Sequence, residues 1–274
     1  MLNAAAGLAS VRQQRDICFA PDHGLSLDVY TPQRGRGPLP TVVFFYGGGW
    51  DSGFRAMYRF VGAALAARGF AVVIPDYRVY PAVCFPEFLR DAAAAVRWTV
   101  DNIAELGGAP GRLVLAGHSA GAHIAAMLAF DRQWLDAVGL APDRALRGLV
   151  GLSGPYDFLP LESPTLKIIF GPEPERWASQ PINFVDRPVV PSFLAAGKRD
   201  RRVDPANSVR LAKRIETRGG AVELKLYPRT GHELLIGAFS PLLAPLVPVL
   251  ADVTRFVANV TDAAPAEIGR EMPA

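Results

Sequence analysis

The stretch that decides the fold is Leu113-Val-Leu-Ala-Gly-His-Ser-Ala-Gly-Ala-His-Ile-Ala-Ala-Met-Leu-Ala129. It opens with the apolar run of a buried strand and closes with a segment that is apolar all round, which is typical of a buried helix. Between them lies a G-x-S-x-G turn, from Gly117 to Gly121. Such a turn projects the serine hydroxyl above the sheet, and its flanks need glycine because a Cβ would strike neighbouring backbone. The stretch therefore predicts Ser119 as a nucleophile, against the alternative of an inert serine in a small-residue turn.

A glycine triplet follows a second predicted strand, in Thr41-Val-Val-Phe-Phe-Tyr-Gly-Gly-Gly-Trp50. Glycines at the end of a buried strand let backbone N–H groups approach a bound group closely. Acyl transfer needs such donors for the oxyanion, and the residue after the nucleophile commonly supplies another. We therefore predict that the oxyanion hole consists of the N–H groups of Gly48, Gly49 and Ala120.

Two further chemical groups follow predicted strands. Asp200 comes three residues after Gly197, at the end of the strand that begins at Phe193, and His232 follows the alternating strand that ends at Tyr227. The chain order Ser119, Asp200, His232 is that of the serine triad in α/β hydrolases. Because parallel sheets place their sites at the carboxyl ends of strands, we expect the three side chains to meet there.

Other aspartates compete for the role of the acid. Asp204 is the nearest rival, but it precedes Pro205 and is expected to cap the helix that begins there. Asp157 could serve only if the acid followed the preceding strand, and otherwise lies in a surface turn. Asp76 and Asp91 are expected to pair with arginines.

Five motifs occur in the order of a known family: Tyr46-Gly-Gly-Gly-Trp50, Asp76-Tyr-Arg78 with Phe85-Pro86, Gly117-His-Ser-Ala-Gly121, Gly197-Lys-Arg-Asp-Arg-Arg-Val203, and Gly231-His232. Over about residues 12 to 260 the chain resembles the α/β-hydrolase esterases with an HGGG-type oxyanion loop, close to the hormone-sensitive-lipase-like and kynurenine-formamidase-like groups. It departs from them in having Tyr46 where the family usually has histidine, and in lacking an acidic residue between Pro81 and Phe85. Because the oxyanion donors are backbone groups, Tyr46 should retune the loop without removing the hole.

Four residues are candidates for the lining of the substrate pocket. Tyr46, Trp50 and Phe85 are candidates for its lining, although aromatic residues near strand ends are as often part of the core. His118, beside the nucleophile, is a fourth candidate.

The composition sets the remaining limits. A chain of 274 residues that is 50% hydrophobic can bury one large core, so a single domain is expected. The formal net charge of +3, with no basic helix face, argues against a nucleic-acid partner. Only two cysteines are present, which favours free thiols and a cytoplasmic location. Prolines at 241, 245 and 248 argue against a membrane span, and the N-terminus has neither the basic region nor the continuous apolar region of a signal peptide.

The periodicity predicts an eight-stranded, mostly parallel, doubly wound sheet that begins with an antiparallel hairpin. Strands are expected near residues 16–20, 25–30, 41–46, 71–75, 112–116, 148–153, 192–196 and 221–227. Helices are expected near residues 54–68, 87–106, 119–130, 205–218 and 242–259. An insertion at 155–190 is either a small lid or a packed loop, and residues 261–274 are expected to be a disordered tail.

These features predict a serine carboxylesterase that acts on small apolar acyl esters without a metal or another cofactor. An arylformamidase or related amidase with the same triad is the alternative within the enzyme class. A ligand-binding protein on a hydrolase fold is the alternative outside it. A homodimer is left open.

Overall fold

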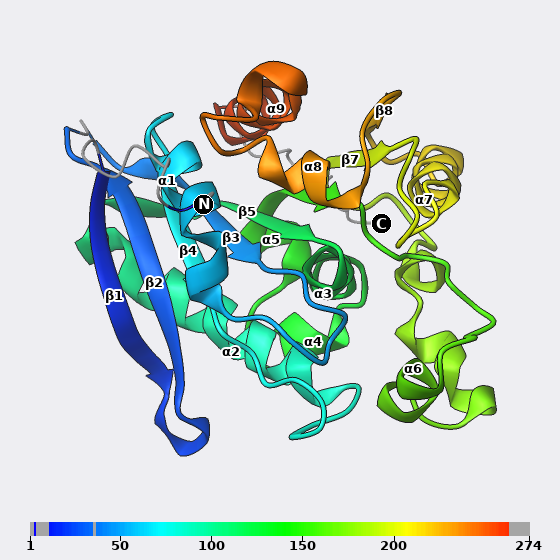
Figure 1. Cartoon of the computed structure of the whole chain (residues 1–274). Coiled ribbons are helices and arrows are strands. Elements are labelled where there is room, and N and C mark those ends of the chain that lie inside the picture. The colour runs from blue at the N-terminus through cyan, green and yellow to red at the C-terminus, as the bar shows by residue number, and fades with distance from the viewer. Residues whose placement is uncertain (1–2, 4–10, 35–36, 263–274) are drawn as a thin grey trace, which may run out of the picture.

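The computed structural model describes residues 3, 11–34 and 37–262 (Figure 1). Within these residues a single sheet of eight strands runs through the molecule in the order β1-β2-β4-β3-β5-β6-β7-β8. The strands are β1 (Val11–Ala20), β2 (Leu25–Pro32), β3 (Leu39–Phe45), β4 (Ala71–Pro75), β5 (Gly108–His118), β6 (Leu146–Leu152), β7 (Ser192–Gly197) and β8 (Val222–Tyr227).

Strand direction divides the sheet into two parts. β1 and β2 form an antiparallel hairpin around a turn in which Gly24 is left-handed, and β2 pairs antiparallel with β4. From β4 to β8 every pairing is parallel. The carboxyl ends of β3, β5, β7 and β8 therefore lie at one edge of the sheet, which gathers the segments that follow them. The predicted architecture is confirmed.

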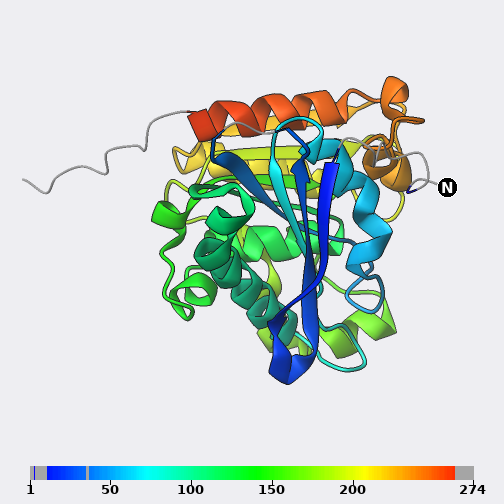
Figure 2. The ribbon, with the colours of Figure 1, turned by 90° about the vertical axis from the view of Figure 1, so that its left-hand side faces the viewer.

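Helices cover both faces of the sheet (Figures 1 and 2). Tyr30, Val72, Val42, Val114 and Gly148 stand in register on neighbouring strands and so share one face. On this face Tyr30 meets α1 at Gly62, and Gly148 meets α9. The main helices are α1 (Arg59–Ala66), α2 (Glu87–Asn102), α3 (Ala120–Phe130), α7 (Ala206–Thr217) and α9 (Val249–Asp262).

The elements that the sequence predicted are present with shifted ends. The helix expected at 54–68 begins as a 3-10 turn, Arg55–Tyr58, before α1, and the one expected at 87–106 ends in another, Ile103–Leu106. Outside the insertion, three short α-helices in the described residues were not predicted: α4 (Gln133–Asp136), α5 (Pro142–Ala145) and α8 (His232–Gly237). Each has only four to six residues, too few to give a periodic signal.

The insertion between β6 and β7 has short helical segments of its own, α6 (Pro164–Ile169) and the 3-10 turns Glu173–Ser179 and Pro181–Phe184. Several buried hydrogen bonds attach it to the body of the domain. The carboxamide of Asn207 on α7 accepts from the backbone N–H groups of Tyr156 and Asp157, and His123 Nε2 lies 2.8 Å from the carbonyl oxygen of Ser179.

The prediction of a disordered tail from residue 261 is wrong at its start. Thr261 and Asp262 belong to the last turn of α9, where Arg112 donates to the Thr261 carbonyl and forms an ion pair with Asp262. The rest of the expected tail, residues 263–274, lies outside the described residues, as does most of the N-terminal segment, in which no signal peptide is expected.

Candidate active site

Ser119 lies on the turn between β5 and α3, in a conformation that strand and helix geometry do not offer. Its φ of 55° and ψ of −123° are unusual for a residue with a side chain. A Cβ on Gly117 would lie 2.2 Å from the Gly121 carbonyl oxygen, and one on Gly121 would lie 2.1 Å from the Phe45 carbonyl oxygen. Both flanking glycines are therefore required by backbone contacts, as the motif predicted.

Asp200 and His232 come together over this edge from two different strands. His232 Nδ1 lies 2.7 Å from Asp200 Oδ2, and both side chains are buried. The other carboxylate oxygen, Oδ1, accepts hydrogen bonds of 2.9 Å from the N–H groups of Arg202 and Val203. Burial alone would raise the pKa of Asp200, but its hydrogen bonds with His232 and Val203 outweigh that effect and hold it below its usual value. The carboxylate is thus ionised and fixed in orientation.

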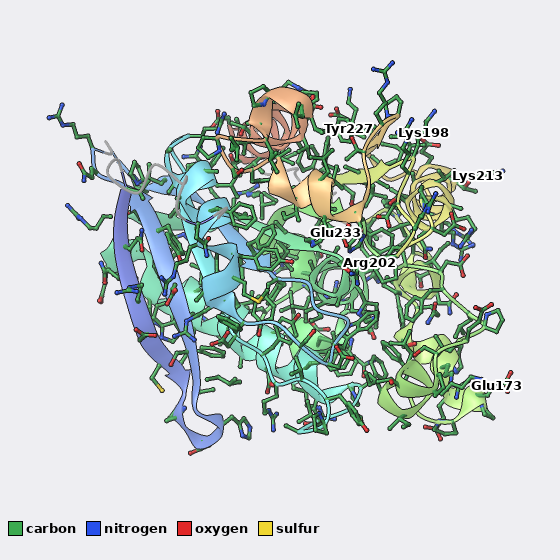
Figure 3. The ribbon with its side chains drawn as sticks, viewed as in Figure 1. Glu173, Lys198, Arg202, Lys213, Tyr227 and Glu233 are labelled. Atoms are coloured by element: carbon green, nitrogen blue, oxygen red, sulfur yellow. The ribbon has the colours of Figure 1, made fainter. Side chains whose placement is uncertain are left out.

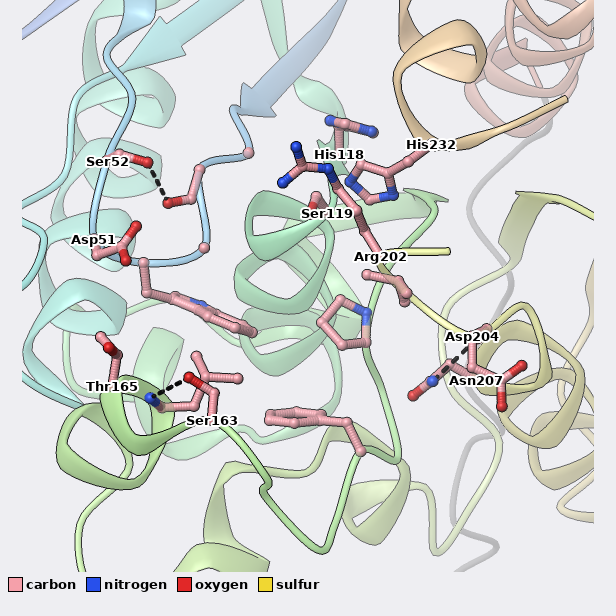
Figure 4. Close-up of a pocket in the computed structure, with 18 of the residues that line it drawn as sticks. Asp51, Ser52, His118, Ser119, Ser163, Thr165, Arg202, Asp204, Asn207 and His232 are labelled. Carbon is pink, nitrogen blue, oxygen red and sulfur yellow. Dashed lines mark hydrogen bonds between the residues drawn. The ribbon is translucent and has the colours of Figure 1, made fainter. Parts of the chain in front are cut away.

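Ser119 and His232 face the same cavity, and Figure 4 shows the imidazole of His232 turned toward the Ser119 hydroxyl. Among the contacts of the described residues the hydroxyl makes no hydrogen bond. A loose nucleophile–base contact is common in structures without substrate, because the bond tightens in the bound complex. The three residues predicted as a triad are therefore gathered at one site.

The glycine loop lies opposite the nucleophile. The carbonyl of Gly48 accepts from the N–H of Ser52 at 3.0 Å and from its hydroxyl at 2.8 Å, which closes the turn. A Cβ on Gly48 would lie 2.0 Å from the Ser52 carbonyl oxygen. Within the described part of the chain, the N–H groups of Gly48, Gly49 and Ala120 have no hydrogen-bond partner. These are the three N–H groups that the sequence predicts as oxyanion donors, and in the described residues they are unpaired.

Tyr46 supports this loop from below and does not line the cavity. Its ring stacks on Tyr77 at 4.4 Å, and the Tyr77 hydroxyl donates to the Tyr46 carbonyl at 2.7 Å. Phe85 does not line the cavity either, because it packs against Phe88, Trp134 and Phe170. The expectation that these two aromatic residues line the cavity is wrong: Tyr46 is buried in the core, and Phe85 is partly buried where it packs against that core.

Trp50 and His118, by contrast, do border the cavity, whose volume is about 1160 Å³. One wall comes from the insertion and is largely apolar, and another comes from the segment around α7 and is polar. The apolar wall contains Phe158, Leu159, Pro160, Leu161 and Leu166, and the polar wall contains Arg202, Asp204, Asn207 and Arg210, with Asp157 of the insertion paired to Arg210.

Ion pairs and caps occupy the competing acidic residues. Asp157 pairs with Arg210, and Asp204 accepts from the N–H of Ala206 at the start of α7. Asp76 pairs with Arg55, and Asp91 forms a two-pronged contact with Arg78. At the rim of the cavity Arg202 pairs with Glu233 at 2.5 Å (Figure 3). Asp200 is thus the acid that contacts a histidine.

Two histidines near the nucleophile turn, His118 and His123, are neutral. Burial lowers the pKa of His118 to about 3, with the neighbouring His232 as a second cause, and burial lowers the pKa of His123 to about 4. Tyr58, from the 3-10 turn before α1, contacts His118 and was not predicted, because no motif surrounds it. In residues 3, 11–34 and 37–262, no group of three or more His, Cys, Asp and Glu is placed to hold a metal ion, and no helix is long and apolar enough to cross a membrane.

The sheet order and the site at its carboxyl edge define an α/β-hydrolase fold. A truncated carbohydrate esterase from gut microbiota has a similar solved structure, with a TM-score of 0.80 at 21% identity over 92% of this chain and 97% of that one. The model of the BD-FAE family matches residues 27–215, so the chain belongs to the BD-FAE family.

Two curated relatives extend the comparison. The chain is 30% identical over 244 residues to the isoprenylcysteine alpha-carbonyl methylesterase ICME of Arabidopsis thaliana, which covers 81% of this chain and 57% of the relative. It is 31% identical over 248 residues to the esterase LipC of Mycobacterium tuberculosis, which covers 82% of this chain and 61% of the relative. The chain thus spans little more than half of the length of these relatives.

Proposed function

We propose that the protein is a serine carboxylesterase in which Ser119, His232 and Asp200 form the catalytic triad. The observation that carries this proposal is the 2.7 Å contact between His232 and a fixed, ionised Asp200 beside a strained serine. The two relatives are named as a methylesterase and an esterase, which supports an ester as the substrate.

The mechanism follows from the contacts. Asp200 accepts a hydrogen bond from the Nδ1–H of His232, which leaves Nε2 free to take the proton of Ser119 as the hydroxyl attacks an ester carbonyl. The N–H groups of Gly48, Gly49 and Ala120 would stabilise the oxyanion, at about 3 kcal/mol each. His232 then returns the proton to the leaving alcohol, and a water molecule repeats the sequence to release the acid. None of these steps uses a cofactor.

The two walls of the cavity suggest how a substrate lies. An acyl chain would contact the apolar insertion, and a polar alcohol would contact the side chains near α7. The cavity volume of about 1160 Å³ exceeds what an acetyl or butyryl ester fills. The cavity therefore has room for longer acyl groups beside the insertion at 155–190.

Turnover of p-nitrophenyl acetate, butyrate and decanoate should be compared with that of N-formylkynurenine in the wild type and in Ser119→Ala. We expect ester turnover that disappears in the variant, together with labelling by a fluorophosphonate that also disappears. Turnover of the formamide alone would favour the amidase alternative. Absence of both turnover and labelling would favour a ligand-binding role.

The location and the oligomeric state of the protein complete the proposal. Cys18 and Cys84 are free thiols, which supports action in the cytoplasm. Light scattering on the purified protein would decide between a monomer and the homodimer that the sequence leaves open.

A further inference from the structure

A buried chain of hydrogen bonds joins the oxyanion loop to the nucleophile turn. The N–H of Gly47 donates to the Tyr58 hydroxyl at 3.1 Å, and this hydroxyl lies 3.0 Å from His118 Nδ1. The ring of His118 in turn packs against the ring of His232, with centroids 4.6 Å apart (Figure 4). Three segments that are distant in the sequence are connected in this way.

The positions of the protons in this chain follow from counting donors. If Tyr58 donates to Nδ1 of His118, the proton on Nε2 is the one group left without a partner. If Nδ1 donated instead, both the Tyr58 hydroxyl proton and the bare Nε2 would lack partners. The first arrangement leaves fewer buried polar groups unsatisfied, so Gly47 donates to Tyr58 and Tyr58 donates to His118.

Close packing also restricts the movement of the oxyanion loop. A Cβ on Gly47 would lie 3.0 Å from His118 Nδ1 and 3.0 Å from the Ser119 Cβ, so the loop packs directly on the nucleophile turn. Gly48 and Gly49, the predicted oxyanion donors, are the next two residues. Tyr46, on the other side, is held by Tyr77, and its ring centroid lies 6.1 Å from that of Tyr58.

We propose that Tyr58 and His118 are positioning residues, which fix the oxyanion loop in register with Ser119 and His232. This inference rests on the proposed esterase function. Donor groups held in advance at the place where charge develops are effective because they need no rearrangement during the reaction, so loosening them costs rate more than binding. Neither residue would contact the reacting atoms.

Charge is not part of this role. Burial raises the pKa of Tyr58 to about 12, partly offset by the N–H of Gly47, and His118 stays neutral down to strongly acidic conditions. A variant that removes the hydrogen bond should therefore lower the rate without moving the pH profile of kcat/KM between about pH 6 and 9.

The test compares Tyr58→Phe, His118→Phe, His118→Asn and the double variant Tyr58→Phe/His118→Phe. Tyr30→Phe is the matched control, because the Tyr30 hydroxyl is also buried and bonded, to Asp28, but lies on β2 away from the site. Each protein is assayed for kcat and KM with p-nitrophenyl butyrate, for the rate of fluorophosphonate labelling at Ser119, and for its melting temperature.

We expect Tyr58→Phe and His118→Phe each to lower kcat about tenfold with KM within about twofold, and Tyr30→Phe to change neither. His118→Asn should stay within about threefold of the wild type, because its amide oxygen can take the place of Nδ1. The double variant should be about as slow as the worse single variant, since both interrupt one chain.

The inference is overturned if Tyr58→Phe matches Tyr30→Phe, if His118→Phe is faster than His118→Asn, or if the two single effects multiply. If the wild type hydrolyses no ester but is labelled at Ser119, the proposed function fails while the labelling rates still decide the inference. If Ser119 is not labelled in the wild type, both fail. Should His118→Phe unfold, Tyr58→Phe and His118→Asn decide alone.

Discussion

Replacement of Asp200 by asparagine should stop catalysis while leaving the fold intact. In the wild type, Oδ1 of Asp200 accepts from the N–H groups of Arg202 and Val203, both at 2.9 Å, and Oδ2 faces His232 Nδ1 at 2.7 Å. An asparagine keeps its single oxygen toward the two N–H donors, so its NH₂ group must face the imidazole. That group can only donate, and His232 must then present a bare Nδ1 and carry its proton on Nε2.

With its proton on Nε2, His232 cannot accept the proton of Ser119. The expected loss is about 10⁴-fold in kcat, or about 5.5 kcal/mol of transition-state stabilisation, which is the scale found when a triad histidine is locked in the wrong tautomer. The shape of the side chain and its two backbone hydrogen bonds are kept, so the melting temperature should change little.

The assay is hydrolysis of p-nitrophenyl butyrate by Asp200→Asn, with Asp131→Asn as the matched control. Asp131 is also buried and accepts hydrogen bonds, from Gln133, but it lies beyond the far end of α3 and does not line the cavity. An Asp200→Asn variant with more than about a tenth of the wild-type kcat would refute the tautomer argument. A loss of rate accompanied by unfolding would make Asp200 a structural residue instead.

Three further outcomes follow from the same structure. Gly121→Ala should destabilise the fold by about 3 kcal/mol, because its Cβ would strike the Phe45 carbonyl, whereas Gly111→Ala, which has open space, should not; equal urea midpoints would contradict this. His123 takes up a proton below about pH 6.5 in the unfolded state, but only near pH 4 in the folded state, where burial lowers its pKa. Lowering the pH from 7 to 5 should therefore cost the wild type about 2 kcal/mol of stability, and His123→Phe should not show this loss. Urea titrations in which both proteins lose stability in parallel would contradict this prediction. Asn207→Ala leaves two N–H groups of the insertion unpaired and should cost about 2 kcal/mol and raise KM, and an unchanged KM in steady-state assays would separate the insertion from substrate binding.

Local patterns were enough to predict the parallel sheet and the nucleophile turn. In β5 and α3 the change from a strand period to an all-apolar helix is written in consecutive residues, and every residue of α3 is indeed buried. The turn glycines were readable for the same reason, since their requirement comes from backbone a few residues away or on the adjacent strand. Short helices such as α8 were missed because six residues carry no period.

The surroundings of the site depended on contacts that no local pattern encodes. Phe85 and Trp50 look alike in sequence, as aromatic residues beside glycine or proline turns, and both pack against Phe170, yet only Trp50 borders the cavity. Which way each ring turns depends on side chains from α2, α3 and the insertion that pack around it.

The sequence alone determined that a serine, an acid and a histidine follow one another along the chain, each just past the end of a strand. This could be predicted because strand and turn preferences are local. Only the tertiary structure decided which groups touch, including the Asp200–His232 contact and the path from Gly47 through Tyr58 to His118. Those contacts join residues up to 60 positions apart in the chain, and packing of the whole domain sets their distances.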